Sequence, residues 1–197
     1  LHVRSRRQRQ MCIRDRDEIS NMTELDLSTI DAIAVAGGPG SFTGLRIGSA
    51  TAKGLGLALE KPLISIPTTA AIAYNIWDTD KFVCPIMDAR RNQVYTGVYC
   101  YTDHRLDTVW EQDTMSIEAL AEGLNCLDHE VIFLGDGVAV YREKLEALLT
   151  IPFSFAPAHV NRQRAAAVGA LAEVYYKEGK IQTAEEPVSY THLRAHE

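Results

Sequence analysis

Short apolar runs alternate with longer stretches of helical spacing along most of the chain. Apolar runs typical of strands occur at 32–36, 63–66, 82–87, 94–101, 108–114 and 131–134. Helical patterns follow at about 42–59, 68–77, from Ser116, at 138–149 and at 162–177. Strands that alternate with helices predict an α/β fold.

Composition divides the chain into four parts. A polar gap at 102–105 predicts a boundary between a first domain at 17–104 and a second domain at 105–186. Residues 1–16 contain six arginines, and residues 187–197 do not continue the preceding helical pattern. We interpret both ends as adaptor-derived, non-native and disordered, because they lack apolar periodicity.

A glycine-rich turn joins the first apolar run to the first helix, where α/β proteins commonly bind ligands. Residues 37–54 contain neither a Walker loop nor a complete dinucleotide-binding pattern. Backbone N–H groups at the start of a helix can still hold an anion. The candidate anion or nucleotide residues here are Gly38, Gly40, Ser41 and Thr43, although an ordinary turn with a Ser or Thr cap explains the same pattern.

The helix after this turn carries a small residue at every fourth position: Gly44, Gly48, Ala52 and Gly56. Such a ridge lets another backbone approach closely, and the rest of the helix is apolar apart from one narrow stripe. The ridge predicts either contact with the chain's own sheet or an interface with a partner protein. The candidate interface residues are Gly44, Leu45, Gly48, Ser49, Ala52, Lys53 and Gly56.

Four sequence blocks together resemble one family. They are Gly-Pro-Gly-Ser-Phe-Thr-Gly-Leu-Arg-Ile-Gly at 38–48, Lys-Pro-Leu-Ile-Ser-Ile at 61–66, Met-Asp-Ala-Arg-Arg-Asn-Gln-Val-Tyr at 87–95 and Leu-Gly-Asp-Gly at 134–137. The chain is similar to bacterial TsaB (YeaZ-type) proteins over about residues 20–186. The resemblance implies an actin-like ATPase (ribonuclease-H-like) fold with two related mixed-sheet domains, the first lacking its opening strands.

The resemblance also implies a function. TsaB-type proteins are non-catalytic partners that bind and activate the paralogue TsaD, which transfers the threonylcarbamoyl group to tRNA. We therefore expect a TsaD heterodimer, a TsaE-type ATPase as a further partner, and a homodimer through the same helix as an alternative. We expect no cofactor of the chain's own, with ATP or ADP only at the partner interface.

An enzymatic role is the alternative hypothesis. The family pattern of TsaD has a His-x-x-x-His metal motif where this chain has Thr68-Thr69-Ala70-Ala71-Ile72, so we predict no catalytic and no metal-ligating residues. An ATPase or kinase of the same superfamily would need an N-terminal phosphate hairpin that is absent here, and a peptidase has no supporting motif. Gly135, Asp136 and Gly137 form a second candidate nucleotide loop, or a plain turn with Asp136 as the helix cap.

Charge and cysteine content limit the partners and the compartment. The chain has 20 basic and 26 acidic residues, a net charge of −6, and the arginine-rich start supplies six of the basic residues. An acidic body repels phosphate, so we expect contact with tRNA only through a partner. Cys84, Cys100 and Cys126 lack metal or redox spacing, which indicates reduced thiols in the cytoplasm. The sequence contains no run of eighteen apolar residues, so it predicts no membrane span.

Overall fold

The structure is a computed structural model that describes residue 15 and residues 18–186. The strands are β1 (Ile33–Gly38), β2 (Leu63–Pro67), β3 (Phe82–Arg90), β4 (Gln93–Thr102), β5 (Arg105–Ser116), β6 (Val131–Leu134) and β7 (Phe153–Phe155). The helices are α2 (Phe42–Leu59), α3 (Thr68–Ala73), α4 (Ile117–Leu127), α5 (Val138–Leu148) and α6 (Ala165–Lys177), with 3-10 turns η1 (Leu27–Thr29) and η2 (Ala158–Val160).

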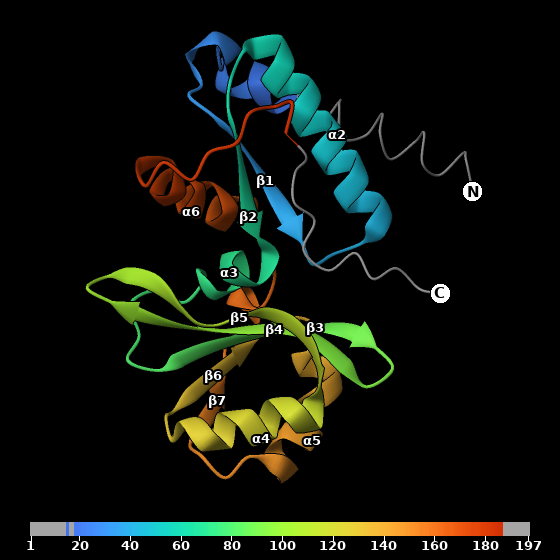
Figure 1. The fold of residues 1–197 in the computed structure, drawn as a ribbon, viewed down its shortest axis with the longest axis vertical. Coiled ribbons are helices and arrows are strands. Elements are labelled where there is room, and N and C mark those ends of the chain that lie inside the picture. Colours follow the sequence, from blue (N-terminus) through green and yellow to red (C-terminus); the bar gives the residue numbers. More distant parts are fainter. Residues whose placement is uncertain (1–14, 16–17, 187–197) are drawn as a thin grey trace.

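The strands form two sheets (Figure 1). In the described residues the first sheet is the parallel pair β1–β2, in which Ile33 lies beside Leu63 and Ala36 beside Ile66. The second sheet has the order β5-β4-β3-β6-β7 and is mixed, because β3 pairs antiparallel with β4 and parallel with β6. Helix α3 lies between the two sheets, so it couples them into one body.

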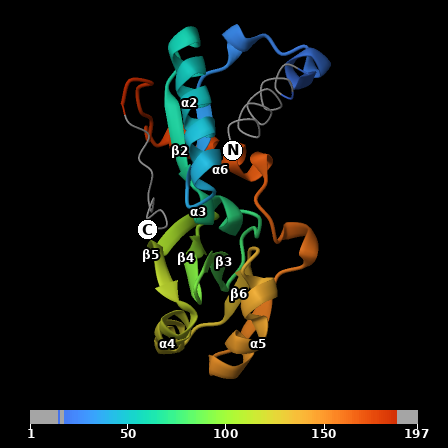
Figure 2. The same ribbon diagram turned by 90° about the vertical axis from the view of Figure 1, so that its right-hand side faces the viewer.

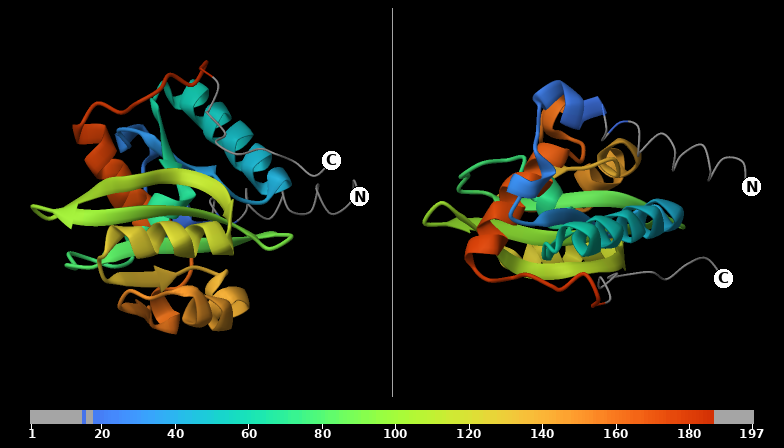
Figure 3. Two further views of the ribbon diagram at one scale, coloured as in Figure 1. Left: turned by 60° about the horizontal axis from the view of Figure 1, so that its bottom comes forward. Right: turned by 90° about the horizontal axis from the view of Figure 1, so that it is seen from above.

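Both faces of the second sheet are covered by helices. Successive side chains of a strand point to opposite faces. Accordingly Cys84 and Ile86 of β3 pack with the core of α4 and α5, while Val83 and Met87 pack with α3 and α6. Figure 3 shows α4 lying along one side of this sheet. Burial on both faces explains why β3 and β6 are almost continuously apolar in sequence.

Helices α2 and α6 flank the first sheet on opposite sides, as Figures 1 and 2 show. Ile64 and Ile66 of β2 pack with Leu171 and Ala172 of α6. Ala52 of α2 packs with Leu63 on the other side. The first sheet is thus sandwiched by one helix from the start of the chain and one from its end.

The predicted domain boundary at 102–105 lies within the second sheet. Residues 102–105 are the tight turn of the β4–β5 hairpin, in which Asp103 and His104 have φ of 49° and 63°. Strands β3 and β4, assigned by the sequence to the first domain, belong to the second sheet, and α6, assigned to the second domain, packs on the first sheet. A polar gap marks a turn equally well within a sheet and between domains, because both need solvent-exposed turn residues.

Of the other local predictions, one cap agrees with the structure and several details differ. Ser116 caps α4 as predicted, since its Oγ accepts a hydrogen bond from the N–H of Ala119 at 3.1 Å. Asp136 does not cap α5, whose N-cap is Gly137 without a side-chain bond. The short strand β7 was not predicted, and α6 begins three residues later than expected.

Two expectations concern the ends of the chain and the membrane. The adaptor-like segments, 1–16 and 187–197, lie outside the described residues except for Asp15. Within the described part of the chain, no helix combines the length and apolarity that crossing a bilayer requires.

Candidate functional site

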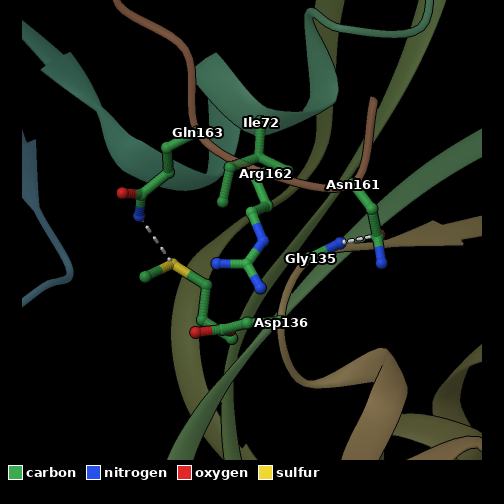
Figure 4. Close-up of a pocket in the computed structure, with 7 residues that line it drawn as sticks. Ile72, Gly135, Asp136, Asn161, Arg162 and Gln163 are labelled. Atoms are coloured by element: carbon green, nitrogen blue, oxygen red, sulfur yellow. Dashed lines mark hydrogen bonds between the residues drawn. The ribbon is translucent and has the colours of Figure 1, made fainter. Parts of the chain in front are cut away.

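A pocket opens between the two sheets, and two of the predicted site residues line it. Its cavity is about 240 Å³. Ile72 comes from α3, Met87 from β3, Gly135 and Asp136 from the turn after β6, and residues 161–163 from the segment before α6. Figure 4 shows these side chains around the cavity. Segments distant in sequence therefore build one site.

Glycine is required at two positions of the turn after β6. Gly135 has φ of +107°, and a Cβ there would lie 2.2 Å from the carbonyl oxygen of Ile86. At Gly137 the same oxygen would lie 2.9 Å away. Real Cβ atoms do not approach a backbone oxygen this closely, and L side chains rarely adopt this φ. The turn therefore packs directly on β3, which fixes where Asp136 projects.

Two backbone donors of this turn, those of Gly135 and Gly137, are engaged by the chain itself. The N–H of Gly135 donates to Oδ1 of Asn161 at 2.6 Å, and the N–H of Gly137 donates to the carbonyl of Ile86 at 3.0 Å. A phosphate-binding loop needs free N–H groups that point at the anion. The exposed carboxylate of Asp136 at the rim also repels phosphate.

An actin-like ATPase fold implies a nucleotide, but the pocket does not fit one. Besides the engaged donors, its volume lies below the roughly 300–1,000 Å³ typical of sites for drug-sized ligands. No three His, Cys, Asp or Glu side chains in the described residues gather into a group that could hold a metal ion.

Side-chain hydrogen bonds hold the segment that carries Arg162. The amide of Asn75 donates to the carbonyl of Val160 at 3.0 Å and to that of Arg162 at 2.8 Å. On its other side, Asn161 accepts from Gly135. The backbone beneath Arg162 is thus anchored to α3's end and to the turn after β6, so the guanidinium projects from a fixed position.

The first predicted loop does not reach the pocket. Gly38, Gly40, Ser41 and Thr43 lie at the end of β1 and the start of α2, and none of them lines the cavity. The Oγ of Ser41 accepts from the N–H of Gly44 at 3.4 Å and caps α2, as predicted. The two candidate loops therefore do not form one site within this cavity.

The ridge on α2 faces the chain's own sheet over part of its length. Ser49, Ala52 and Gly56 are buried, and a Cβ at Gly56 would meet Leu63 and Ala184 at 3.0 Å. Gly44, Leu45, Gly48 and Lys53 are half-buried. The close approach that the ridge allows is therefore made by the chain's own first sheet. This contact is one of the two alternatives that the sequence left open.

The opposite face of α2 is a surface that the sequence reasoning missed. Ala50 and Gly54 are exposed at its centre, and nothing lies within 4 Å of a Cβ placed on Gly54. Phe42 and Leu57 stand at its two ends, 46% and 57% exposed. At about 100° per residue, Ala50, Gly54 and Leu57 lie within about 60° of one another, and Phe42 lies about a further 60° round the helix. We call these four residues the outer face of α2.

A second polar network ties the β3–β4 turn to α4 and α5. The amide of Asn92 donates to the carboxylate of Glu118 at 3.0 Å, and Lys144 donates to Asn92 Oδ1 at 2.8 Å and pairs with Glu118. The hydrogen bond from Lys144, followed by those from the Glu118 backbone and Asn92, lowers the pKa of Glu118 from 4.5 to about 2. The turn is therefore held against both helices.

We expect the Glu118 carboxyl to titrate near pH 2 by NMR. Because its folded-state pKa is depressed, its contribution to stability is present above pH 4.5 and is lost as pH falls toward 2. Lys144→Met should raise the pKa toward 4.5, and added salt should do so in part, since the group is exposed. An unchanged pKa in Lys144→Met would contradict the assigned cause.

Comparison with known proteins identifies the family of this chain. The family described as "TsaD: tRNA N6-adenosine threonylcarbamoyltransferase" matches residues 4–194, so this chain belongs to that family. Within it, the chain is of the TsaB/YeaZ type. It is 37% identical to "tRNA threonylcarbamoyladenosine biosynthesis protein TsaB" of Bacillus subtilis, over 66% of this chain and 55% of the relative. Escherichia coli TsaB is 32% identical over 61% of this chain and 53% of the relative.

Solved structures agree on the fold. YeaZ from Pseudomonas aeruginosa superposes with a TM-score of 0.73 at 24% identity, covering 90% of this chain and 82% of that chain. A second structure, of a protein with similarity to peptidase YeaZ, gives 0.78 at 23% identity, covering 94% and 83%. Together with the family match, these superpositions support the predicted actin-like fold. The chain spans about half of the length of the B. subtilis and E. coli relatives.

Proposed function

We propose that this chain is a non-catalytic accessory subunit in tRNA threonylcarbamoyladenosine biosynthesis that binds and activates a TsaD-type transferase as a heterodimer in the cytoplasm. Relatives from three bacteria carry this pathway in their names, which supports the pathway assignment. The acidic chain repels RNA phosphates, so the partner would supply the contact with tRNA. A TsaE-type ATPase is the further partner that we propose.

The outer face of α2 is the observation that carries the proposal. Exposed Phe42 and Leu57 are apolar anchors, and the small Ala50 and Gly54 between them leave room for a partner helix to pack at a short interaxial distance. Arg46 lies over the Phe42 ring at 5.2 Å and adds a cation beside the apolar surface. We place any ATP or ADP of the assembly at the partner interface, because the N–H groups of Gly135 and Gly137 are engaged internally.

We expect Ala50→Arg to weaken binding of a TsaD-type partner at least tenfold, which is about 1.4 kcal/mol. The substitution puts bulk and charge where close helix packing is proposed. Isothermal titration calorimetry of the chain with the purified partner measures the effect. Ala50 is exposed, so the variant should unfold at the same denaturant concentration as the wild type.

The matched control is Ala170→Arg, an exposed alanine on α6, across the sheet from α2. It should bind the partner like the wild type. Equal losses in both variants, or no loss in Ala50→Arg, would contradict the assigned face. If Ala50→Arg instead abolishes a dimer of the chain alone in light scattering, the same face serves the homodimer.

The transferase alternative lacks specific support. At the position of the family's two metal-ligating histidines this chain has Thr68 and Ile72, which are both buried in α3. A hydroxyl and an alkyl group do not replace two imidazoles at a metal. The ATPase or kinase alternative would have to use the pocket beside Asp136, whose size and engaged donors do not suit a nucleotide.

A further inference from the structure

Two opposite charges face the pocket between the sheets. The guanidinium of Arg162 extends from the segment before α6 toward the turn that carries Asp136, as Figure 4 shows. In the described part of the chain, neither side chain makes an ion pair. Both charges are therefore available to a ligand.

The backbone beneath each charge is held by bonds to a rigid neighbour. Asn75 anchors the backbone of Arg162, and the Gly135 turn beneath Asp136 packs on the backbone of β3. Oδ1 of Asp136 also accepts a hydrogen bond from the N–H of Asp88 at 3.3 Å. A site whose backbone is fixed before binding loses less entropy when a ligand arrives.

The rest of the pocket sets the size and polarity of the ligand. Ile72 and Met87 form an apolar wall, and Gln163 contributes an amide whose Nε2 lies 3.9 Å from the Met87 sulfur. The cavity of about 240 Å³ admits a molecule much smaller than a nucleotide. A small ligand must therefore satisfy one cation, one anion and one apolar surface at once.

We propose that this pocket binds a free α-amino acid with a short apolar side chain. Arg162 would pair with the carboxylate through its two-pronged guanidinium, Asp136 would accept hydrogen bonds from the ammonium group, and the side chain would contact Ile72 and Met87. A simple anion satisfies Arg162 but is repelled by Asp136, whereas a zwitterion satisfies both. Binding here does not depend on the partner contact of α2, which lies on a different element.

Asp136→Asn distinguishes a site for a zwitterion from a site for a simple anion, because it should weaken binding of the first and not of the second. The asparagine keeps an oxygen that can accept from Asp88 but loses the charge. L-valine, measured by NMR titration of the full chain, should bind the variant at least tenfold more weakly than the wild type. Isovalerate, which has the same side chain and carboxylate without the amine, and inorganic phosphate should bind the variant as well as or better than the wild type.

Arg162→Gln should abolish binding of L-valine, and the matched control Arg164→Gln, an exposed arginine outside the pocket, should leave it unchanged. Isobutylamine, which lacks the carboxylate, should bind weakly to every variant. Tighter binding of isovalerate or phosphate than of L-valine to the wild type would overturn the proposal in favour of an anion site. Absence of L-valine binding to the wild type would also overturn it, without bearing on partner binding.

Discussion

Gly135→Ala is expected to destabilise the protein by about 3 kcal/mol or more, or to prevent cooperative folding. A residue with a Cβ is strained at φ of +107°, at a cost of roughly 1–3 kcal/mol. The added methyl would also lie 2.2 Å from the carbonyl oxygen of Ile86, a central part of β3 that pairs with β4. Relief requires moving the turn away from β3. Urea unfolding followed by circular dichroism measures the loss.

The matched control is Gly169→Ala in α6. Gly169 has nothing within 4 Å of the added Cβ and no positive φ, so the change should be neutral or stabilise by about 0.5–1 kcal/mol through helix propensity. Replacing glycine with alanine should thus lower the free energy of unfolding at position 135 and leave it unchanged or raise it at position 169. Similar urea midpoints for the two variants would show that the turn does not pack on β3 as described.

Ala52→Leu is expected to lower stability by about 1–3 kcal/mol, because it overpacks a filled space. Ala52 is 5% exposed and packs against Leu63, with Ile33, Val35 and Ala184 around it. The larger side chain must displace α2 from the first sheet or adopt a strained rotamer. Partner affinity should fall only as far as the folded fraction falls, since this side of α2 points inward.

Ala50→Leu is the control for the other side of the helix. Ala50 is exposed, so leucine there should leave the free energy of unfolding within about 0.5 kcal/mol of the wild type. Its expected effect is a weaker affinity for the partner, because leucine fills the room that Ala50 leaves for a partner helix. If Ala50→Leu destabilises the chain and Ala52→Leu does not, the orientation of α2 on the first sheet is wrong.

Local features could be predicted where residues adjacent in sequence determine them. The strand β6 has the predicted limits, 131–134, because four consecutive apolar residues indicate a fully buried strand. The caps at Ser41 and Ser116 follow from a side chain that bonds to an N–H three residues away. The glycine-rich block and the Gly-Asp-Gly turn indicated the family and the turn that lines the pocket.

Features that depend on pairing between distant segments could not be predicted. Strand β7 has three residues, Phe153–Phe155, and pairs with β6 only in the folded chain. The polar turn at Asp103 and His104 has a composition common to hairpins and to linkers, so the sequence placed a domain boundary inside a sheet.

The sequence by itself determined the α/β class, the family and the fact that α2 is too apolar to be fully solvated. Only the tertiary structure decided which side of α2 is buried: the ridge at Ala52 and Gly56 lies on the first sheet, and the outer face at Ala50 and Gly54 is exposed. Both faces carry small residues at helical spacing, so periodicity alone cannot distinguish them. The tertiary structure also decided the pocket. Asp136 and Arg162 are distant in sequence, and they line one cavity only because the turn after β6 lies beside the segment before α6.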